Sequence, residues 1–413
     1  MRIKSSELPF GVFDKVKAAQ PGIESAITPG ADICQADHSR FYTEHQFLEL
    51  KDGVESIYTI EFSRGCWKGY NRHCTFCGLN GLRMFYRCRD TEKVIHEIAS
   101  EYKAGKKIFY LVDSVIDLNK MKYIFDYCRH YFKDAIFMCD TVSSLSFKQM
   151  KYLADCGFLI ITAGIESLHP RHLKLMRKGV AAISNIAYLK YAKINKITVL
   201  WNMLTLMPGD TCQDYEELAE ITPYLEHLSP PNFSIIRFDR HSLYWENPDK
   251  YGITLVPMSN VSYLYPEDSD IDLNAISMYF DNTRDDATVP YKSVCLVNLR
   301  NSIINWQRMY RGGASLKLEG NMIHDARSIS CCKGHVVDEN EMKLIEFLFF
   351  QKTKEETAMY VNQNNLSHIF DLYIKRGYII MWDNHYISLI IHDISPSRRK
   401  VIDKRWTYMS SLI

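Results

Sequence analysis

Three cysteines stand close together in the chain, at Cys66, Cys74 and Cys77, with the spacing Cys-x7-Cys-x2-Cys. They follow an apolar, β-prone run from Ile57 to Phe62, and glycines flank them on both sides. Three thiolates on one loop can bind three irons of a 4Fe–4S cluster and leave the fourth iron open to another ligand. The spacing therefore favours an iron–sulfur site whose open iron carries the chemistry.

Zinc binding and chance are the two alternatives that the spacing leaves open. A structural zinc site normally takes four Cys or His ligands, arranged as two pairs. This segment has one Cys-x2-Cys pair, Cys74 and Cys77, to which His73 or Cys88 could add a fourth ligand. In the remaining interpretation the cysteines are unrelated buried thiols.

The elements that must position these cysteines alternate along the chain between strand-like and helix-like segments. Apolar or β-branched runs lie at 57–63, 107–112, 135–139, 158–163, 197–206 and 232–238. Helix-like stretches lie between them, at about 92–104, 119–131, 146–155, 182–195 and 213–227. Parallel strands need helical crossovers, so the pattern predicts an α/β fold, a partial six-stranded (β/α)6 barrel. Active sites of such folds lie at the carboxyl ends of the strands, and the cysteine loop follows the first strand.

The parts outside the barrel segments are expected to form smaller units. Residues 1–50 show no clear periodicity and are predicted to be an N-terminal arm or cap. The barrel domain is predicted to span 51–295, and a connecting helix and loop to span 296–340. Three helical segments followed by a hairpin predict a winged-helix-like domain over 341–413. Its third helix has basic residues only at its end, Lys375 and Arg376, which argues against insertion into DNA.

The composition of the 413 residues is that of a globular protein, with 46% hydrophobic and 24% charged residues and a net charge of +1. This charge gives no strong attraction to nucleic acid or to an anionic membrane. No apolar run approaches the roughly 18 residues of a spanning helix, and the start lacks a signal peptide's apolar core, so a cytoplasmic protein is expected. Without an export signal, the scattered cysteines, Cys212 and Cys295 among them, are expected to pack as small apolar residues.

The residues around the last cysteine resemble those of a known superfamily. Phe76 precedes Cys77, and glycines follow at 78 and 81. This pattern resembles the radical S-adenosylmethionine (SAM) enzymes. The longer spacing, inside Ser-Arg-Gly-Cys-Trp and before Cys-Gly-Leu-Asn-Gly, resembles the branch that matures ribosomally made precursor peptides (RiPPs). The resemblance covers roughly residues 50–280 and, more weakly, the tail.

The resemblance implies the cofactors and the reaction. The cofactors would be a 4Fe–4S cluster on the three cysteines and SAM on the open iron. Reductive cleavage of SAM would give a 5′-deoxyadenosyl radical, which abstracts hydrogen from a carbon of the substrate. An electron donor such as flavodoxin or ferredoxin, and a small peptide-docking protein, are the further partners expected.

The same resemblance, together with position in the fold, suggests which side chains contact SAM. Phe76 would pack near the adenine, and Asp113 and Ser114 end the second strand, where relatives hold the methionine amine. Glu166 and Ser167 are further candidates for polar contacts with the cofactor. The alternatives are that Asp113 caps the turn that follows it and that Ser167 is the N-cap of the next helix.

Four later residues complete the candidate site. Asn202 lies in an otherwise apolar strand, where a buried amide would need partners and so favours a ligand contact. Arg237 could bind the carboxylate of the cofactor or of a substrate. Arg240 and Tyr244 are candidates for substrate binding, with a surface salt bridge and an aromatic packing role as their respective alternatives.

The substrate is expected to be a precursor peptide, modified by excision, cross-linking or epimerisation. Chemistry on a small molecule, including transfer of a 3-amino-3-carboxypropyl group, is the alternative within enzymes. A zinc-stabilised regulator that binds nucleic acid is the alternative from another class. No cobalamin is predicted, because Cys66 comes too early for a preceding cobalamin domain and the cobalamin signature Asp-x-His-x-x-Gly is missing.

Overall fold

The computed structural model describes residues 57–392, except 80, 82–84, 266–269, 284–288 and 291. The predicted N-terminal arm at 1–50 and the last residues of the tail, from 393 onward, lie outside the described residues. Across the part described, no helix is long and apolar enough to cross a membrane.

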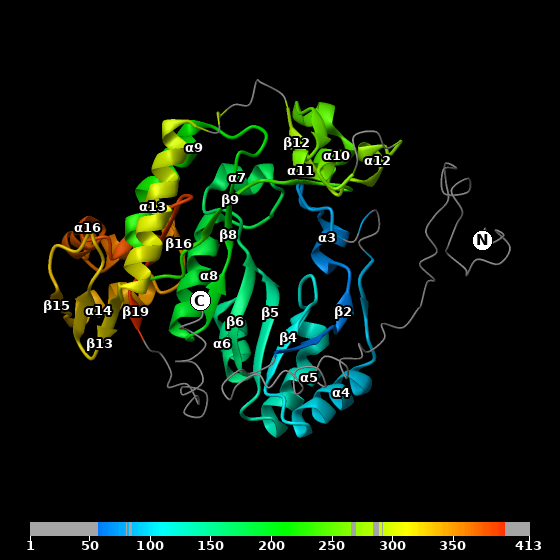
Figure 1. Ribbon diagram of the computed structural model, residues 1–413. Coiled ribbons are helices and arrows are strands. Elements are labelled where there is room, and N and C mark those ends of the chain that lie inside the picture. The colour runs from blue at the N-terminus through cyan, green and yellow to red at the C-terminus, as the bar shows by residue number, and fades with distance from the viewer. Residues whose placement is uncertain are drawn as a thin grey trace.

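A five-stranded parallel sheet forms the centre of the fold (Figure 1). Its strands, in spatial order, are β1 (Ile57–Ile60), β4 (Ile108–Leu111), β5 (Ile136–Val142), β6 (Phe158–Gly164) and β7 (Thr198–Leu200). The helices between them are α4 (Thr91–Lys103), α5 (Leu118–Tyr131), α6 (Phe147–Asp155), α7 (Pro170–Leu175) and α8 (Ala182–Ile194). The predicted α/β fold with a parallel sheet is thereby confirmed.

The predicted fifth strand, 197–206, changes its partner at Trp201. The part before it, β7, pairs with β6, whereas β8 (Asn202–Thr205) pairs in parallel with β9 (Asn232–Ile235). Trp201 is buried, and its indole N–H donates to the carbonyl of Ser229 at 2.9 Å. A single bridge, Glu166 to Met203, links the two parts. The six predicted segments are all present, but as a five-stranded sheet and a pair, not as one hydrogen-bonded sheet.

The two faces of the sheet differ. One face carries large apolar side chains such as Tyr58, Phe109 and Phe137, which belong to the main hydrophobic core together with residues of α4, α5, α6 and α8. On the other face, an apolar floor at the amino ends of the strands consists of Ile108, Ile136, Leu159 and Ile160. Towards the carboxyl ends the side chains of this second face become partly exposed. The sheet is therefore accessible at the end where the cysteine loop begins.

A small unit of short elements follows β9. It contains the three-stranded antiparallel sheet β10 (Phe238–Asp239), β12 (Tyr279–Asn282) and β11 (Leu255–Pro257). Its helices are α10 (Leu243–Glu246), η3 (Pro248–Tyr251), α11 (Ser259–Ser262) and α12 (Leu273–Ile276). A second hydrophobic cluster, with Phe238, Tyr244 and Phe280, joins this unit to Leu173 and Met176 at α7. The unit thus packs on the carboxyl side of the sheet, beside α3 in Figure 1.

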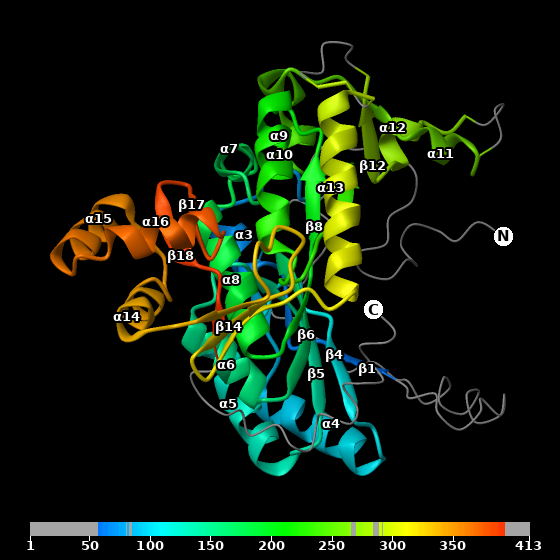
Figure 2. The same cartoon turned by 90° about the vertical axis from the view of Figure 1, so that its left-hand side faces the viewer.

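Two long helices close the side of the domain. They are α9 (Cys212–Ile221), continued by η2 (Thr222–Leu225), and α13 (Val294–Arg311), and they lie side by side (Figure 2). A disulfide joins Cys212 to Cys295, with 5.5 Å between their Cα atoms. The expectation that these two cysteines are only packing residues is therefore wrong, because the neighbouring helix starts bring their thiols together.

The tail contains the three helices and the hairpin that the sequence predicts. The helices are α14 (Glu339–Phe347), α15 (Lys354–Gln363) and α16 (Ser367–Lys375). The hairpin strands β17 (Ile379–Trp382) and β18 (His385–Ser388) form a sheet with β16 (Lys352–Thr353), in the order β16-β18-β17. A second sheet combines three strands that come before α14 with one that follows β18. Its strands, in spatial order, are β15 (Gly334–Val336), β14 (Met322–Asp325), β13 (Leu316–Glu319) and β19 (Ile391–His392). The winged-helix-like identity of this unit stays a prediction.

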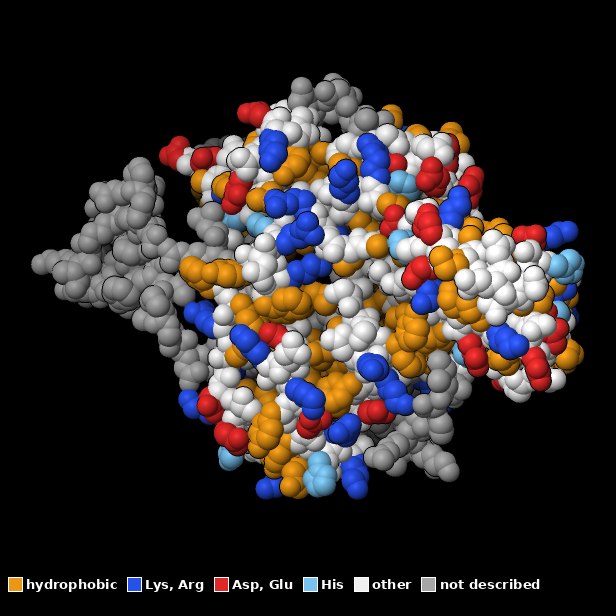
Figure 3. All heavy atoms as spheres, turned by 180° about the vertical axis from the view of Figure 1, so that it is seen from behind, with side chains coloured by type: hydrophobic (Ala, Val, Ile, Leu, Met, Phe, Trp, Pro, Cys, Tyr) orange, Lys and Arg blue, Asp and Glu red, His pale blue; other side chains and the backbone are white. Residues whose placement is uncertain are grey.

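The tail shares its core with the parallel domain. Leu344, Ile345 and Tyr373 belong to the same hydrophobic cluster as the sheet, and the ammonium group of Lys190 in α8 donates to the carbonyl of Phe349 at 2.8 Å. From behind, the tail stands out at the side of the molecule, and hydrophobic side chains gather across the middle of this face (Figure 3). The predicted domain boundaries stay predictions, because one core runs across them.

The tail also completes α8. The N-cap residue of this helix, Ala181, has no side chain that could accept a hydrogen bond. Instead, the carboxylate of Asp383, in the turn of the tail hairpin, accepts a hydrogen bond from the N–H of Ala182 at 2.9 Å. The first turn of a helix has free N–H donors, and here one of them is satisfied by a residue far along the chain.

Candidate active site

The cysteine loop leaves the first strand and forms a short helix. After β2 (Ser63–Arg64), which pairs with β3 (Arg87–Cys88), Cys66 is the N-cap of α3 (Trp67–Asn71). Its thiol accepts a hydrogen bond from the N–H of Gly69 at 3.2 Å. Cys66, Cys74 and Cys77 are all partly buried, and none of them is in a disulfide. Three free thiols are thus available on one loop, as predicted from their spacing.

The second half of the loop is fixed by backbone contacts with distant segments. The N–H of Thr75 donates to the carbonyl of Met176 at 3.3 Å, and the carbonyl of Thr75 accepts from the N–H of Tyr244 at 3.1 Å. A ring nitrogen of His73 lies 2.6 Å from the carbonyl oxygen of Cys77. His73 therefore closes the loop on itself through one of its two ring nitrogens.

Gly78 permits the closest approach in the site. A Cβ atom at this position would lie 1.9 Å from the carbonyl oxygen of Arg240 and 2.8 Å from the Cβ of Asp239. Both neighbours lie at the end of β10, so the backbone after Cys77 rests directly on that strand end. Any larger residue would move Cys77.

The spread of the thiols distinguishes a cluster from zinc. Zinc bonds of about 2.3 Å to sulfur place tetrahedral ligands roughly 3.8 Å apart. Of the residues that the structure describes, only His169, His172 and Asp214 form a group whose ligand atoms all lie within 4.8 Å of one another. At least one pair of the three cysteine sulfurs therefore lies more than 4.8 Å apart, farther than two ligands of one zinc ion and compatible with ligands of separate irons.

Two lysines place positive charge beside the thiols. Burial is the main cause that raises the pKa of the Cys77 thiol to about 12; a backbone hydrogen bond from Leu79 opposes it, and the nearby Cys74 and Cys66 thiols add to it. Burial lowers the pKa of Lys178, but Glu166 and the Cys74 and Cys77 thiols raise it more, so it stays charged. Burial and the charge of Lys178 lower the pKa of Lys68. Cations in this position favour the thiolate form that iron requires, so the donor set fits an iron–sulfur cluster.

Asp113 holds the start of the cysteine loop. Its carboxylate accepts hydrogen bonds from the N–H groups of Phe62 at 3.0 Å and Ser63 at 2.5 Å, and from the Ser63 hydroxyl. Burial raises the pKa of Asp113 to about 6, and these hydrogen bonds oppose that effect. Asp113 therefore does not cap the turn that follows it, and its carboxylate is not free to accept a hydrogen bond from the amine of SAM. The neighbouring Ser114 is partly buried in the turn after β4.

Glu166 and Ser167 have different positions at the end of β6. Glu166 has a positive φ of 61°, and its carboxylate lies 3.3 Å from the ammonium of Lys178. Ser167 is fully buried, and its hydroxyl accepts from the N–H of His169 at 3.0 Å. His169, not Ser167, is the N-cap of α7. Glu166 therefore faces the cysteine loop, whereas the hydroxyl of Ser167 is occupied within the protein, which corrects its predicted cofactor contact.

Asn202 is exposed, although it is a candidate because a buried amide is expected there. The residue begins β8 opposite Asn232 and is exposed, whereas its neighbours Trp201 and Met203 are buried. Its side-chain amide is therefore not a buried polar group that needs a ligand as its hydrogen-bond partner. Its place at the accessible face of the strands keeps a ligand contact as a prediction.

The aromatic candidates differ in their exposure. Phe76 is partly buried against the second hydrophobic cluster, and the ammonium of Lys178 lies 5.9 Å from the centre of its ring. Tyr244 is 1% exposed and packs against Phe238 and Tyr251. Because a substrate cannot reach a side chain at this depth, the packing interpretation of Tyr244 is correct and its predicted substrate contact is not.

The two arginines bind within the small unit. Arg240 donates to the carbonyls of Ser277, at 2.6 Å, and of Asn274, so it holds the end of α12 and is not a free substrate ligand. Arg237 is half exposed and donates to the carboxylate of Asp239 at 2.7 Å. Arg237 retains solvent-facing surface for an anion.

The sequence reasoning missed three polar residues on the accessible face of the sheet. The hydroxyl of Tyr110 in β4 donates to the carboxylate of Asp140 in β5 at 3.3 Å. Burial raises the pKa of Asp140, and hydrogen bonds from Thr162 and Tyr110 oppose this. The predicted strand ended at residue 139, one position before Asp140, whereas β5 continues to Val142. Lys178 was also missed as a site residue, although it lies in a segment that carried the resemblance.

The fold and the site together give a parallel α/β domain with three free thiols on the loop after its first strand, a donor set that suits an iron–sulfur cluster. Residues 60–221 match the sequence profile of the Radical SAM superfamily. This part of the chain is therefore a radical SAM domain, and its cofactors are a 4Fe–4S cluster and SAM.

Three known proteins that resemble the chain match parts of it. Uncharacterized methyltransferase PH0819 of Pyrococcus horikoshii is 28% identical over 183 residues, which are 42% of this chain and 38% of that protein. The methyltransferase TsrM from Kitasatospora setae is 16% identical with a TM-score of 0.41 over 49% of this chain and 40% of that one. Methylornithine synthase (PylB) is 12% identical with a TM-score of 0.35 over 68% and 77%. TM-scores this low support no argument about function.

Proposed function

We propose that this protein is a radical SAM enzyme that modifies a ribosomally made precursor peptide. The observation that carries the proposal is the set of three free thiols on one loop, spread too widely for zinc and flanked by Lys68 and Lys178. The chemistry supplied when cluster and SAM are bound is a one-electron cleavage of the C–S bond of SAM, which starts hydrogen abstraction.

The side chains of the site have separate tasks. Cys66, Cys74 and Cys77 hold the cluster, and Asp113 fixes the backbone that leads into their loop. Glu166 is the acceptor for the amine of SAM, and Lys178, which pairs with Glu166 at 3.3 Å, is the nearby cation for its carboxylate. These assignments follow from charge, because an ammonium group and a carboxylate each need a partner of opposite sign in a buried site.

The substrate binds over the carboxyl half of the accessible sheet face. The apolar floor closes the amino half, so a substrate can approach only where Tyr110, Asp140 and Thr162 lie. Asp140 accepts a hydrogen bond from the substrate and positions the carbon that loses hydrogen. The resemblance of the cysteine segment to peptide-maturing enzymes supports a peptide as the substrate, with excision, cross-linking or epimerisation as its outcome.

The tail docks the peptide in this proposal. A cavity of about 700 Å³ lies between α9 and the tail, lined by Tyr224, Phe370, Ile374 and the hairpin residues 379–382, with Glu220 and Asp371 among its polar groups. Apolar walls with a few charges suit an amphipathic segment. A flavodoxin or ferredoxin supplies the electron.

A small-molecule substrate is the second candidate. The name of the Pyrococcus relative includes methyltransferase, which favours methyl transfer as an outcome that the assay must be able to detect. Transfer of a 3-amino-3-carboxypropyl group belongs to the same class. The zinc-stabilised regulator is disfavoured by the wide spread of the cysteine sulfurs.

The test has two stages. Anaerobically reconstituted protein should contain iron and sulfide and form 5′-deoxyadenosine on reduction with SAM. The triple variant C66A/C74A/C77A should do neither, and C88A, at an exposed cysteine of β3, should match the wild type. Equal 5′-deoxyadenosine formation by the triple variant would refute the proposal.

The second stage identifies the product by mass spectrometry of a candidate precursor peptide. A lost backbone fragment means excision, the loss of a pair of hydrogens a cross-link, and an added methylene methylation. An unchanged mass with an inverted residue means epimerisation. If SAM is cleaved but small molecules alone are altered, the peptide part of the proposal is wrong and the radical SAM part stands.

A further inference from the structure

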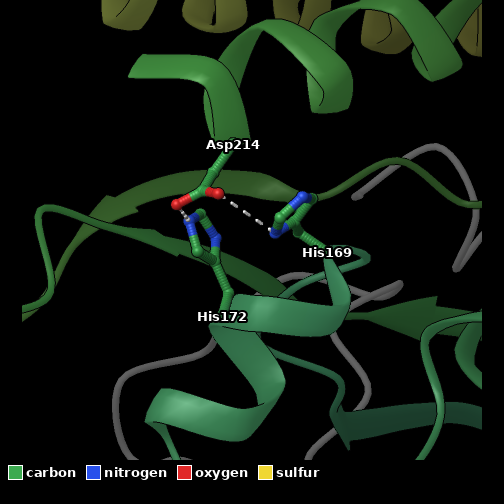
Figure 4. A group of neighbouring side chains, drawn as sticks. All are labelled: His169, His172 and Asp214. Atoms are coloured by element: carbon green, nitrogen blue, oxygen red, sulfur yellow. Dashed lines mark ion pairs between the residues drawn. The ribbon is translucent and has the colours of Figure 1, made fainter. Parts of the chain in front are cut away.

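A second cluster of potential metal ligands lies away from the cysteine loop, between α7 and α9. It consists of His169, His172 and Asp214, whose exposed fractions are 6%, 0% and 4%. Figure 4 shows both imidazole rings, from the start of α7, directed at the carboxylate that comes down from α9. Nothing in the proposed radical chemistry uses these three side chains.

The distances within this cluster are too long for hydrogen bonds. Nδ1 of His169 lies 3.7 Å from Oδ1 of Asp214, and Nε2 of His172 lies 3.4 Å from Oδ2. Hydrogen bonds from N–H to oxygen are normally 2.7–3.2 Å long. Both nitrogens are buried and have no hydrogen-bond partner, and a buried polar atom without a partner requires an explanation.

The contact of Nε2 of His169 indicates whether Nδ1 presents a proton or a lone pair to the carboxylate of Asp214. Its Nε2 lies 3.1 Å from the carboxylate of Glu217, which can only accept a hydrogen bond. Nε2 therefore carries the proton, and in a neutral ring Nδ1 presents a lone pair to Asp214. A lone pair directed at a carboxylate is repulsive unless a cation lies between them.

His172 lies deeper and can offer a lone pair in the same way. Its Nδ1 lies 3.3 Å from the Ser167 hydroxyl, and its Nε2 faces Asp214 at 3.4 Å. With the ring proton on Nδ1, shared with the Ser167 hydroxyl, Nε2 presents the lone pair that a metal ion requires.

We propose that His169, His172 and Asp214 bind a divalent transition-metal ion, zinc. Two ligands that lie 2.0–2.1 Å from zinc at a tetrahedral angle are about 3.4 Å apart, close to the observed 3.4 and 3.7 Å. Two imidazoles and one carboxylate are common zinc ligands. Glu217 then has the role of a carboxylate that orients a metal-binding histidine from behind.

The other charges at the site are compatible with this ion. The guanidinium of Arg171 donates to Oδ2 of Asp214 and to the carbonyl of Gly209, and the N–H of Thr211 donates to the same Oδ2 at 2.8 Å. These donors approach Oδ2 of the carboxylate, which faces the two imidazoles with Oδ1 towards His169 and Oδ2 towards His172. The ion joins the segment after Glu166 and Ser167 to the start of α9, so its role is to fix that segment.

The test measures zinc in the full-length chain with all three cluster cysteines replaced, C66A/C74A/C77A, so that these thiols cannot bind it. After incubation with zinc sulfate and gel filtration, about one zinc per chain should remain. H172A should lose the ion. E217Q should bind it roughly 10–100-fold more weakly, because it removes the acceptor behind His169. E216Q, the same change on an exposed neighbour in α9, should bind zinc as the parent does.

Cobalt(II) provides an independent measurement. The parent chain should show visible d–d bands without a thiolate-to-cobalt charge-transfer band, and H172A should not. Circular dichroism and thermal melting establish that E217Q, changed at a partly exposed side chain, is folded. If the parent retains no zinc, or if folded E217Q binds it as tightly as E216Q does, the three residues form an ion-pair network and the proposal is wrong. Activity is not needed for this test, so its outcome is independent of the proposed function.

Discussion

Replacing Gly78 with alanine should displace the cluster ligand next to it. The added Cβ would lie 1.9 Å from the carbonyl oxygen of Arg240, and an ordinary contact begins at 3.4 Å, so the backbones must separate by about 1.5 Å. Gly78 has no positive φ, so the effect is one of space alone. Metal sites require ligand distances within about 0.2 Å of their ideal values, and a shift of this size exceeds that tolerance severalfold.

The energetic cost follows from overpacking against backbone on both sides. Such substitutions typically cost about 1–3 kcal/mol, which corresponds to roughly a 5- to 150-fold loss in an equilibrium constant at 1.4 kcal/mol per decade. Iron and sulfide retained by G78A after anaerobic reconstitution and desalting should therefore fall several-fold. The melting temperature should fall by about 2–12 °C, at 2–4 °C per kcal/mol for a domain of this size.

G334A is the matched control for this prediction. The same substitution in β15 places a Cβ 3.4 Å from the flexible sulfur of Met322, without a positive φ. It should retain iron as the wild type does. If G78A and G334A retain equal iron and melt together, the backbone after Cys77 does not rest on β10, and the account of how the loop is held is wrong.

Three further predictions concern other parts of the molecule. Burial lowers the pKa of Lys190 to about 7 from 10.5. Above pH 10.5 this lysine is neutral in the folded and the unfolded state, and its burial carries no charge penalty. As the pH falls to 7 the unfolded state binds the proton more readily, so the free energy of unfolding decreases. K190M should therefore be more stable than the wild type in urea at pH 7, by up to about 5 kcal/mol, and the gain should shrink at pH 10; equal gains at both pH values would contradict this. D140N should lower the yield of modified substrate per 5′-deoxyadenosine roughly tenfold or more, because a hydrogen bond to a charged group contributes about 1.5–3 kcal/mol, and an unchanged ratio would place the substrate elsewhere. Reduction of the Cys212–Cys295 disulfide, which spans 83 residues, should destabilise the chain by on the order of 4 kcal/mol; alkylation of both thiols in unreduced, denatured protein would show that the bond does not form.

The features that the sequence predicted are those that local patterns encode. The cysteine loop, the alternation of strands and helices and the helices of the tail all depend on short-range spacing and periodicity. Burial is a tertiary property, which explains the errors at Ser167, Asn202 and Tyr244. Each lies in a segment of the expected type, but its exposure depends on segments far away in the chain.

The sequence also did not reveal which strands pair with one another. Nothing in residues 197–206 marks Trp201 as the point where one strand leaves β6 and joins β9, because the apolar alternation continues through it. His169 and His172 gave no recognisable motif, since their third partner, Asp214, comes from α9, which follows α8 and two strands. The Cys212–Cys295 bond has the same origin, in the packing of α9 against α13.

The hydrogen bond from Ala182 to Asp383 has a consequence for engineering the protein. A helix whose first turn is completed by a distant hairpin cannot be separated from that hairpin without loss, so the catalytic half is not a portable module. Chimeras that exchange the tail between homologous enzymes should succeed only when the donor hairpin brings an acceptor to the same place. The tail of this chain thus acts as one folding unit with the parallel domain whose helix it caps.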